Sequence, residues 1–66
     1  MGMEKVVLAK VEKVAPNAMA YFCNGTLFVL GVPREMTKIE TALLKILNCG
    51  IIVTPQGNNE YSFDFV

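Results

Sequence analysis

The dipeptide Asn24-Gly25, which lies between two apolar segments at 18–23 and 26–30, constrains the fold of this chain most strongly. A type I′ turn needs two consecutive residues that tolerate a positive φ, and Asn-Gly meets this need. A two-residue turn fixes the register of its hairpin, so Cys23 should face Thr26 and Tyr21 should face Phe28. We therefore predict an antiparallel hairpin over residues 18–30.

Side chains alternate along each strand of this hairpin and separate two faces. One face carries Ala18, Ala20, Phe22, Leu27 and Val29, and the other carries Met19, Tyr21, Cys23, Thr26, Phe28 and Leu30. Both faces are apolar, so each must be covered by another part of the chain or by a partner.

Residues 34–48 show the pattern of an amphipathic helix. The apolar residues at helical spacing are Met36, Ile39, Leu43, Ile46 and Leu47. Thr37 and Glu40 have the spacing of a capping box, although Pro33 could instead open the first turn. We expect Gly50 to end the helix in the left-handed conformation.

A second hairpin is predicted after this helix, with strands at 51–54 and 60–66 and a turn at 55–59. The last segment alternates strictly between apolar and polar residues. Tyr61, Phe63 and Phe65 should point inward, and Glu60, Ser62 and Asp64 should point outward. This strand should therefore have one wet face.

The segment from Glu4 to Val14 is ambiguous, because Val7, Val11 and Val14 fit a helix while its valines favour a strand. We predict a strand, which gives the order β-β-β-α-β-β. The expected fold is one small α+β domain over residues 1–66, an antiparallel-rich sheet with one amphipathic helix on the face of Ala18 and Ala20. If the first segment is a helix instead, the chain becomes two helix–hairpin units, although no repeat of residues is convincing.

Composition excludes several partners. Six basic and six acidic residues give a formal net charge of zero, so no overall field attracts DNA, RNA or an acidic membrane. The longest apolar run is too short to span a bilayer, and the amino terminus does not resemble a secretory signal. We expect a cytoplasmic protein with no membrane partner.

The residues for catalysis are sparse, since the chain has no histidine and a single serine, Ser62. Without histidine, Cys23 and Cys49 cannot complete a four-ligand zinc site within one chain, so we interpret them as packing residues. The glycines are scattered and form no phosphate-binding loop. We therefore predict a non-enzymatic protein with no catalytic, cofactor or metal residues.

The remaining prediction concerns the sheet face opposite the helix, because one helix can cover only one face. The apolar residues expected there are Leu8, Val14, Met19, Tyr21, Phe28 and Leu30. An apolar patch of this kind on so small a domain indicates an interface. We expect the chain to be a protein–protein interaction module that acts as an accessory, regulatory or inhibitor subunit. It should be a homo-oligomer, most simply a homodimer. The alternative is a single-stranded nucleic-acid binder that stacks bases on Tyr21 and Phe28.

Overall fold

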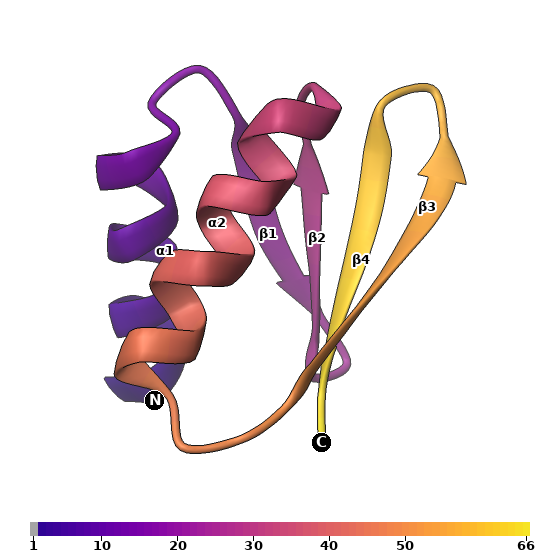
Figure 1. The fold of residues 1–66 in the computed structure, drawn as a ribbon. Helices are drawn as coiled ribbons and strands as arrows, with labels where there is room; N and C mark the ends of the chain where they lie inside the picture. Colours follow the sequence, from indigo (N-terminus) through magenta and orange to yellow (C-terminus); the bar gives the residue numbers. More distant parts are fainter. Residues whose placement is uncertain (1) are drawn as a thin grey trace.

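The structure is a computed structural model that describes residues 2–66. Along the chain the elements are α1 (Gly2–Val14), β1 (Met19–Cys23), β2 (Thr26–Leu30), α2 (Pro33–Ile46), β3 (Ile51–Gly57) and β4 (Glu60–Phe65). The strands form one antiparallel sheet in the order β1-β2-β4-β3, and both helices lie on the same side of it (Figure 1). The predicted α+β class with an antiparallel sheet is confirmed, but residues 2–66 contain two helices where one was predicted.

The first hairpin is as predicted. Asn24 and Gly25 have φ values of 52° and 82°, which are the two positive values that a type I′ turn requires. The strand register runs from Cys23 opposite Thr26 to Met19 opposite Leu30. The two faces of the hairpin are therefore those that the turn predicts.

The segment from Glu4 to Val14 is a helix, so the prediction of a strand was wrong. The helix places Val7, Val11 and, just beyond its end, Ala15 on one side, where all three are fully buried. A strand would have put Ala9 on the same face as Val7, whereas Ala9 is exposed. Burial of an amphipathic stripe outweighed the modest preference of valine for strands.

The width of the sheet explains why two helices are needed. Strands lie about 4.8 Å apart, so four strands are roughly twice as wide as one helix of about 10 Å. The helices pack against each other and run in opposite directions (Figure 1). A single helix would have left half of the inner face open to water.

The two halves of the chain have the same order of elements, a helix followed by a hairpin. Val7 and Val11 of α1 lie 32 positions before Ile39 and Leu43 of α2, and all four are fully buried. In each unit four residues join the helix to its hairpin. The repeat therefore lies in the positions of the buried residues rather than in their identity.

Helix α2 begins earlier than the capping box at Thr37 suggests. Pro33 is its first residue, and the Val32 N–H donates to Oε1 of Glu35 at 3.2 Å. The alternative start at Pro33 is therefore correct. Ile46, the last helical residue, is exposed and does not join the buried stripe.

The predicted left-handed stop at Gly50 was also wrong. Gly50 exchanges two backbone hydrogen bonds with Val66, at 3.0 and 2.9 Å, and so extends the pairing of β3 with β4. The helix ends without a left-handed glycine, because the Leu47 N–H still bonds to the Leu43 carbonyl and the chain then becomes extended.

In the second hairpin, Asn58 and Asn59 form the turn with positive φ values of 54° and 61°. Strand β3 is longer than predicted, since it continues through Pro55 and a bulge to Gly57. The inward residues of β4 are as predicted, since Tyr61 and Phe65 pack against the core and Phe63 is fully buried in it. The prediction of a wet outer face was wrong at Ser62, which is buried.

The core lies between the inner face of the sheet and the two helices. Its fully buried side chains are Val7, Val11, Leu27, Val29, Ile39, Leu43 and Phe63. A Cβ at Gly31 would lie 2.6 Å from Oε1 of Glu35, the flexible end of a side chain of α2, so a larger residue here would displace that side chain. This packing fixes which face of the sheet remains open.

Candidate interaction surface

The outer face of the sheet carries a patch of large apolar side chains on β1 and β2. We call the residues Met19, Tyr21, Phe28 and Leu30 the outer patch. Met19 is 70% exposed, Tyr21 46% and Leu30 40%, while Phe28 is half-buried between its neighbours. Both helices lie on the opposite face, so the outer patch faces solvent (Figure 1).

Two aromatic rings form the centre of the outer patch. Tyr21 and Phe28 face each other across β1 and β2, and their rings are stacked with centroids 5.4 Å apart and planes inclined by 18°. The Tyr21 hydroxyl donates to Oε2 of Glu60 at 3.0 Å, crossing β2 to reach β4. These contacts hold the rings against the sheet and limit the side-chain entropy that binding would remove.

The hydrogen bond to Glu60 also affects the acidity of Tyr21. Donation to the Glu60 carboxylate stabilises the neutral phenol, and partial burial and the negative charge of Glu60 act in the same direction. These effects raise the pKa of Tyr21 above its ordinary value. Tyr21 therefore remains a neutral hydrogen-bond donor throughout the physiological pH range.

Strand β4 borders the outer patch with a row of polar residues, Glu60, Ser62 and Asp64. The Thr26 hydroxyl donates to Oδ1 of Asp64 at 3.0 Å. Ser62 is buried, and its Oγ accepts from Nε2 of Gln56 at 2.9 Å. The outer face is therefore apolar on β1–β2 and polar along β4.

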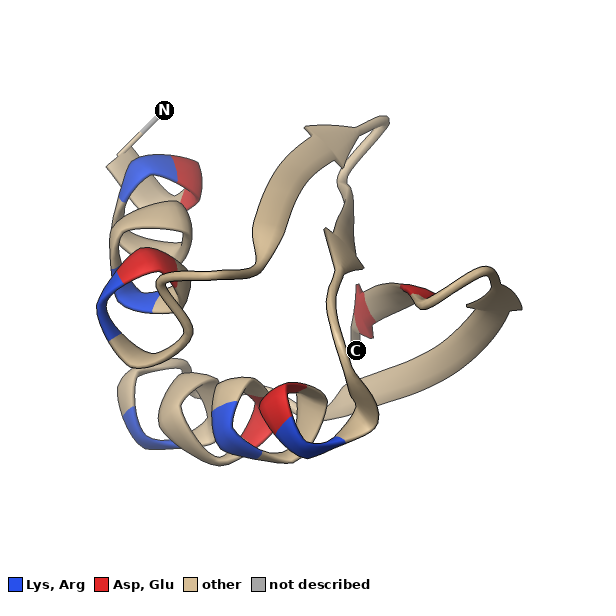
Figure 2. Cartoon of the chain, turned by 90° about the horizontal axis from the view of Figure 1, so that it is seen from above, with Lys and Arg blue, Asp and Glu red and all other residues tan. Residues whose placement is uncertain are grey.

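Charge is distributed unevenly between the two layers. All six lysine and arginine residues lie on α1 and α2, and the strands contain none (Figure 2). The strands carry only two charged residues, Glu60 and Asp64, both on the outer face. The strands that form the outer patch and its border therefore carry no lysine or arginine.

The structure brings together four of the six residues predicted for the interface. Leu8 and Val14 lie on α1 and pack against the core, so they do not join the outer patch. Their predicted place on the outer face depends on residues 4–14 forming a strand, and these residues form a helix.

Sequence reasoning missed Ile52, which is 53% exposed and lies on the outer face of β3. Its neighbour Ile51 packs against the core, so strict alternation along β3 could have identified Ile52 as an outward residue. The row of polar residues on β4 separates it from the outer patch.

Both cysteines are free thiols. Cys23 is exposed beside the first turn, and Cys49 is half-buried before β3. Within residues 2–66, no three histidine, cysteine, aspartate or glutamate side chains gather closely enough to hold a metal ion. In the same part of the chain, neither helix has the length and apolarity needed to cross a membrane.

Comparison of the chain with protein-family models, with curated proteins and with solved structures finds no match.

Proposed function

We propose that the chain is a small non-enzymatic protein–protein interaction module that forms a homodimer through the outer patch. The observation that carries this proposal is the exposure of the patch on the face opposite both helices. Contiguous apolar surface on a small domain is typical of a binding site.

The energetic case rests on the size of the four side chains. Complete burial of a Met, Leu or Phe side chain contributes about 1.5–3 kcal/mol. These side chains are already partly buried in the single chain, so each would contribute only a part of this value. A two-fold axis through the outer patch would cover the exposed parts of eight side chains, four from each copy, and a homodimer needs no second gene product. Tyr21 and Phe28 are already ordered by their mutual stacking, which lowers the entropic cost of association.

As an interaction module the protein would serve as an accessory or regulatory subunit, for example an inhibitor that occupies a surface of another protein. The lack of histidine and the scarcity of nucleophiles favour this role over catalysis. Free cysteines suit the reducing cytoplasm, where we place the protein.

Charge placement makes the nucleic-acid alternative weaker. A stacking platform for bases normally lies in a positive groove, yet the charged residues on the outer face are Glu60 and Asp64. A phosphate backbone along this face would meet repulsion. Salt-dependent retention on single-stranded DNA or RNA would favour this alternative, because phosphate binding weakens steeply as salt rises.

Sedimentation equilibrium of the wild type and the variant Phe28→Lys tests the proposal. The wild type should be a dimer, and Phe28→Lys should be a folded monomer, because it places a charge in the interface while leaving the inner face intact. Met19→Lys, at the most exposed position of the patch, should act in the same way without risk to the fold.

Leu44→Lys is the matched control. Leu44 is 47% exposed, but it lies on α2, on the other side of the molecule. This variant should remain a dimer. A wild type that is monomeric at high concentration, or a dimer that survives both patch variants, would contradict the proposal.

A further inference from the structure

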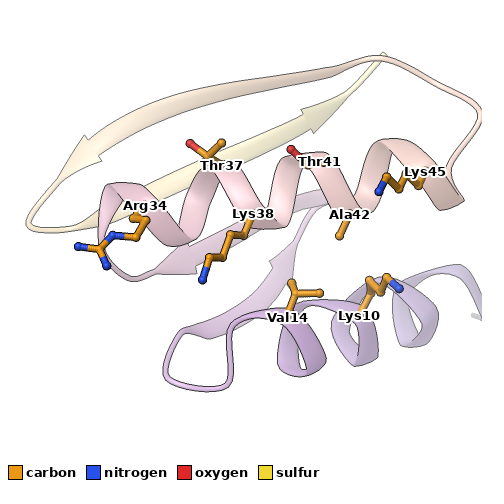
Figure 3. A pocket seen from close by; sticks show the side chains of 8 residues that line it. All are labelled: Lys10, Val14, Arg34, Thr37, Lys38, Thr41, Ala42 and Lys45. Atoms are coloured by element: carbon orange, nitrogen blue, oxygen red, sulfur yellow. The ribbon is translucent and has the colours of Figure 1, made fainter.

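A hollow on the side of the molecule that carries the helices is lined by apolar and basic residues. The proposed interaction surface, on the other side of the sheet, does not account for this combination. The hollow lies between α1 and α2 and has a volume of about 680 Å³. We call it the helix groove. Its apolar side chains, Val14 of α1 and Ala42 of α2, point toward each other across the gap (Figure 3).

The hollow exists because these two side chains are small or short. Deeper in the layer the helices are held together by fully buried residues such as Val11 and Leu43. Nearer the surface, Val14 and Ala42 do not fill the space between the two helices. The groove therefore has an apolar floor that rests on a well-packed core.

Four cations surround this floor. Arg34 and Lys38 of α2 lie toward one end, and Lys45 of α2 and Lys10 of α1 lie toward the other (Figure 3). Arg34 and Lys45 are eleven residues apart, which corresponds to about 16 Å along the helix axis. Their aliphatic stems add apolar walls, and their charged ends remain in water.

No carboxylate lines the groove. Four of the six basic residues gather there, so the rest of the chain holds two basic residues against six acidic ones. A concentration of positive charge over an apolar hollow attracts negatively charged ligands. Thr37 and Thr41 also border the hollow, but their side chains lie on the side of α2 away from α1 (Figure 3).

We propose that the helix groove binds a small amphipathic anion, an organic molecule with an apolar body and a carboxylate or phosphate group. The apolar body would lie on Val14 and Ala42, and the anionic group would bind the cations at one end. The hollow is shallow and open to solvent, so a ligand would lie along it with one side exposed, and its volume of about 680 Å³ leaves room for a small molecule. The site lies on the layer opposite the outer patch, so it goes beyond the proposed interaction function and is independent of it.

Titration of the ¹⁵N-labelled protein with decanoate, followed by amide chemical shifts, tests this inference. Decanoate should give saturable shifts at Val14 and Ala42 and along the facing sides of the two helices. Decanol, which has the same chain without the charge, and inorganic phosphate, which has charge without the chain, should each bind at least about tenfold more weakly. Equal binding of decanol, or shifts confined to the strands, would overturn the proposal.

Two double variants distinguish specific binding in the helix groove from general attraction of an anion to a basic surface. Arg34→Gln with Lys38→Gln removes two groove cations and should weaken decanoate binding by about tenfold or more. Lys5→Gln with Lys13→Gln removes two cations that do not line the groove and should leave the affinity unchanged. Equal losses in the two variants would overturn the proposal, as would tighter binding of an acidic peptide to the same residues.

Discussion

In the first hairpin, strict alternation of side chains produces two apolar faces. One of them belongs to the core, and the other is exposed at the surface. On the inner face Leu27 and Val29 are fully buried beneath the helices. On the outer face Phe28 and Leu30, which alternate with them in β2, border solvent. Apolar character alone therefore does not decide which face becomes the core.

Side-chain size near the start of β1 contributes to the difference. On the inner side, Ala18 just before β1 and Ala20 are small and allow α1 to approach, and the larger Phe22 lies farther along the strand, beside Phe65. On the outer side, Met19 and Tyr21 are both large. A helix packs more closely over small side chains. The large outer side chains are thus left exposed.

The largest expected effect concerns the inner face. Leu43→Ala removes a fully buried side chain between α2 and the sheet and should lower the free energy of unfolding by about 2–5 kcal/mol. Leu44→Ala, one position along the same helix but exposed, should change it by less than about 0.5 kcal/mol. Urea denaturation compares the two, and similar losses would show that α2 does not pack on the face assigned to it.

The separation of the two faces depends on the turn at Asn24-Gly25. A substitution in this turn should cause the next largest loss of stability. Gly25→Val places a β-branched residue at φ 82° and should cost about 1–3 kcal/mol. Gly25→Asn should cost less, because asparagine tolerates positive φ. Thermal unfolding measures both variants, and an unchanged midpoint for Gly25→Val would mean that the turn does not set the register of the hairpin.

Sequence reasoning predicted the hairpins and α2 because their signals are local. A turn dipeptide and a helical stripe each lie within a few residues, and Asn24-Gly25 fixed the register of β1 and β2. The helix α1 was missed because its valines favour a strand locally. The need for a second helix arises from the width of the whole sheet, which no local pattern encodes.

The candidate surface was predicted in part for the same reason. Met19, Tyr21, Phe28 and Leu30 follow from the hairpin register, so they were assigned to one face correctly. The helix groove could not be predicted, because Lys10 and Lys45 come together only when α1 packs against α2.

A smaller loss of stability is expected when the two cysteines are replaced. Cys23 is exposed on the outer face, and Cys49 is half-buried before β3. Cys23→Ser combined with Cys49→Ser should lower the free energy of unfolding by at most about 1 kcal/mol, chiefly through half-buried Cys49. Metal analysis should give the same result for the wild type and the variant. Stoichiometric zinc that disappears in the double variant would contradict the packing role.

The smallest effect concerns the polar border of the outer patch. The pKa of Tyr21 should lie above its ordinary value of about 10. Because the folded state holds this proton more tightly, the stabilising contribution is complete below about pH 10 and is lost as the pH rises through the raised pKa. Ultraviolet titration of the phenol in the wild type and in Glu60→Gln measures the shift, and no difference between them would remove Glu60 as its cause.

Intermolecular nuclear Overhauser effects in an equal mixture of labelled and unlabelled chains would show whether the outer patch forms a homodimer, because they identify the side chains that touch across a dimer. We expect contacts from the rings of Tyr21 and Phe28 to side chains of the outer patch on the other copy. Contacts that involve only α1 and α2, or no contacts in a sample that sediments as a dimer, would show that the outer patch is not the dimer interface.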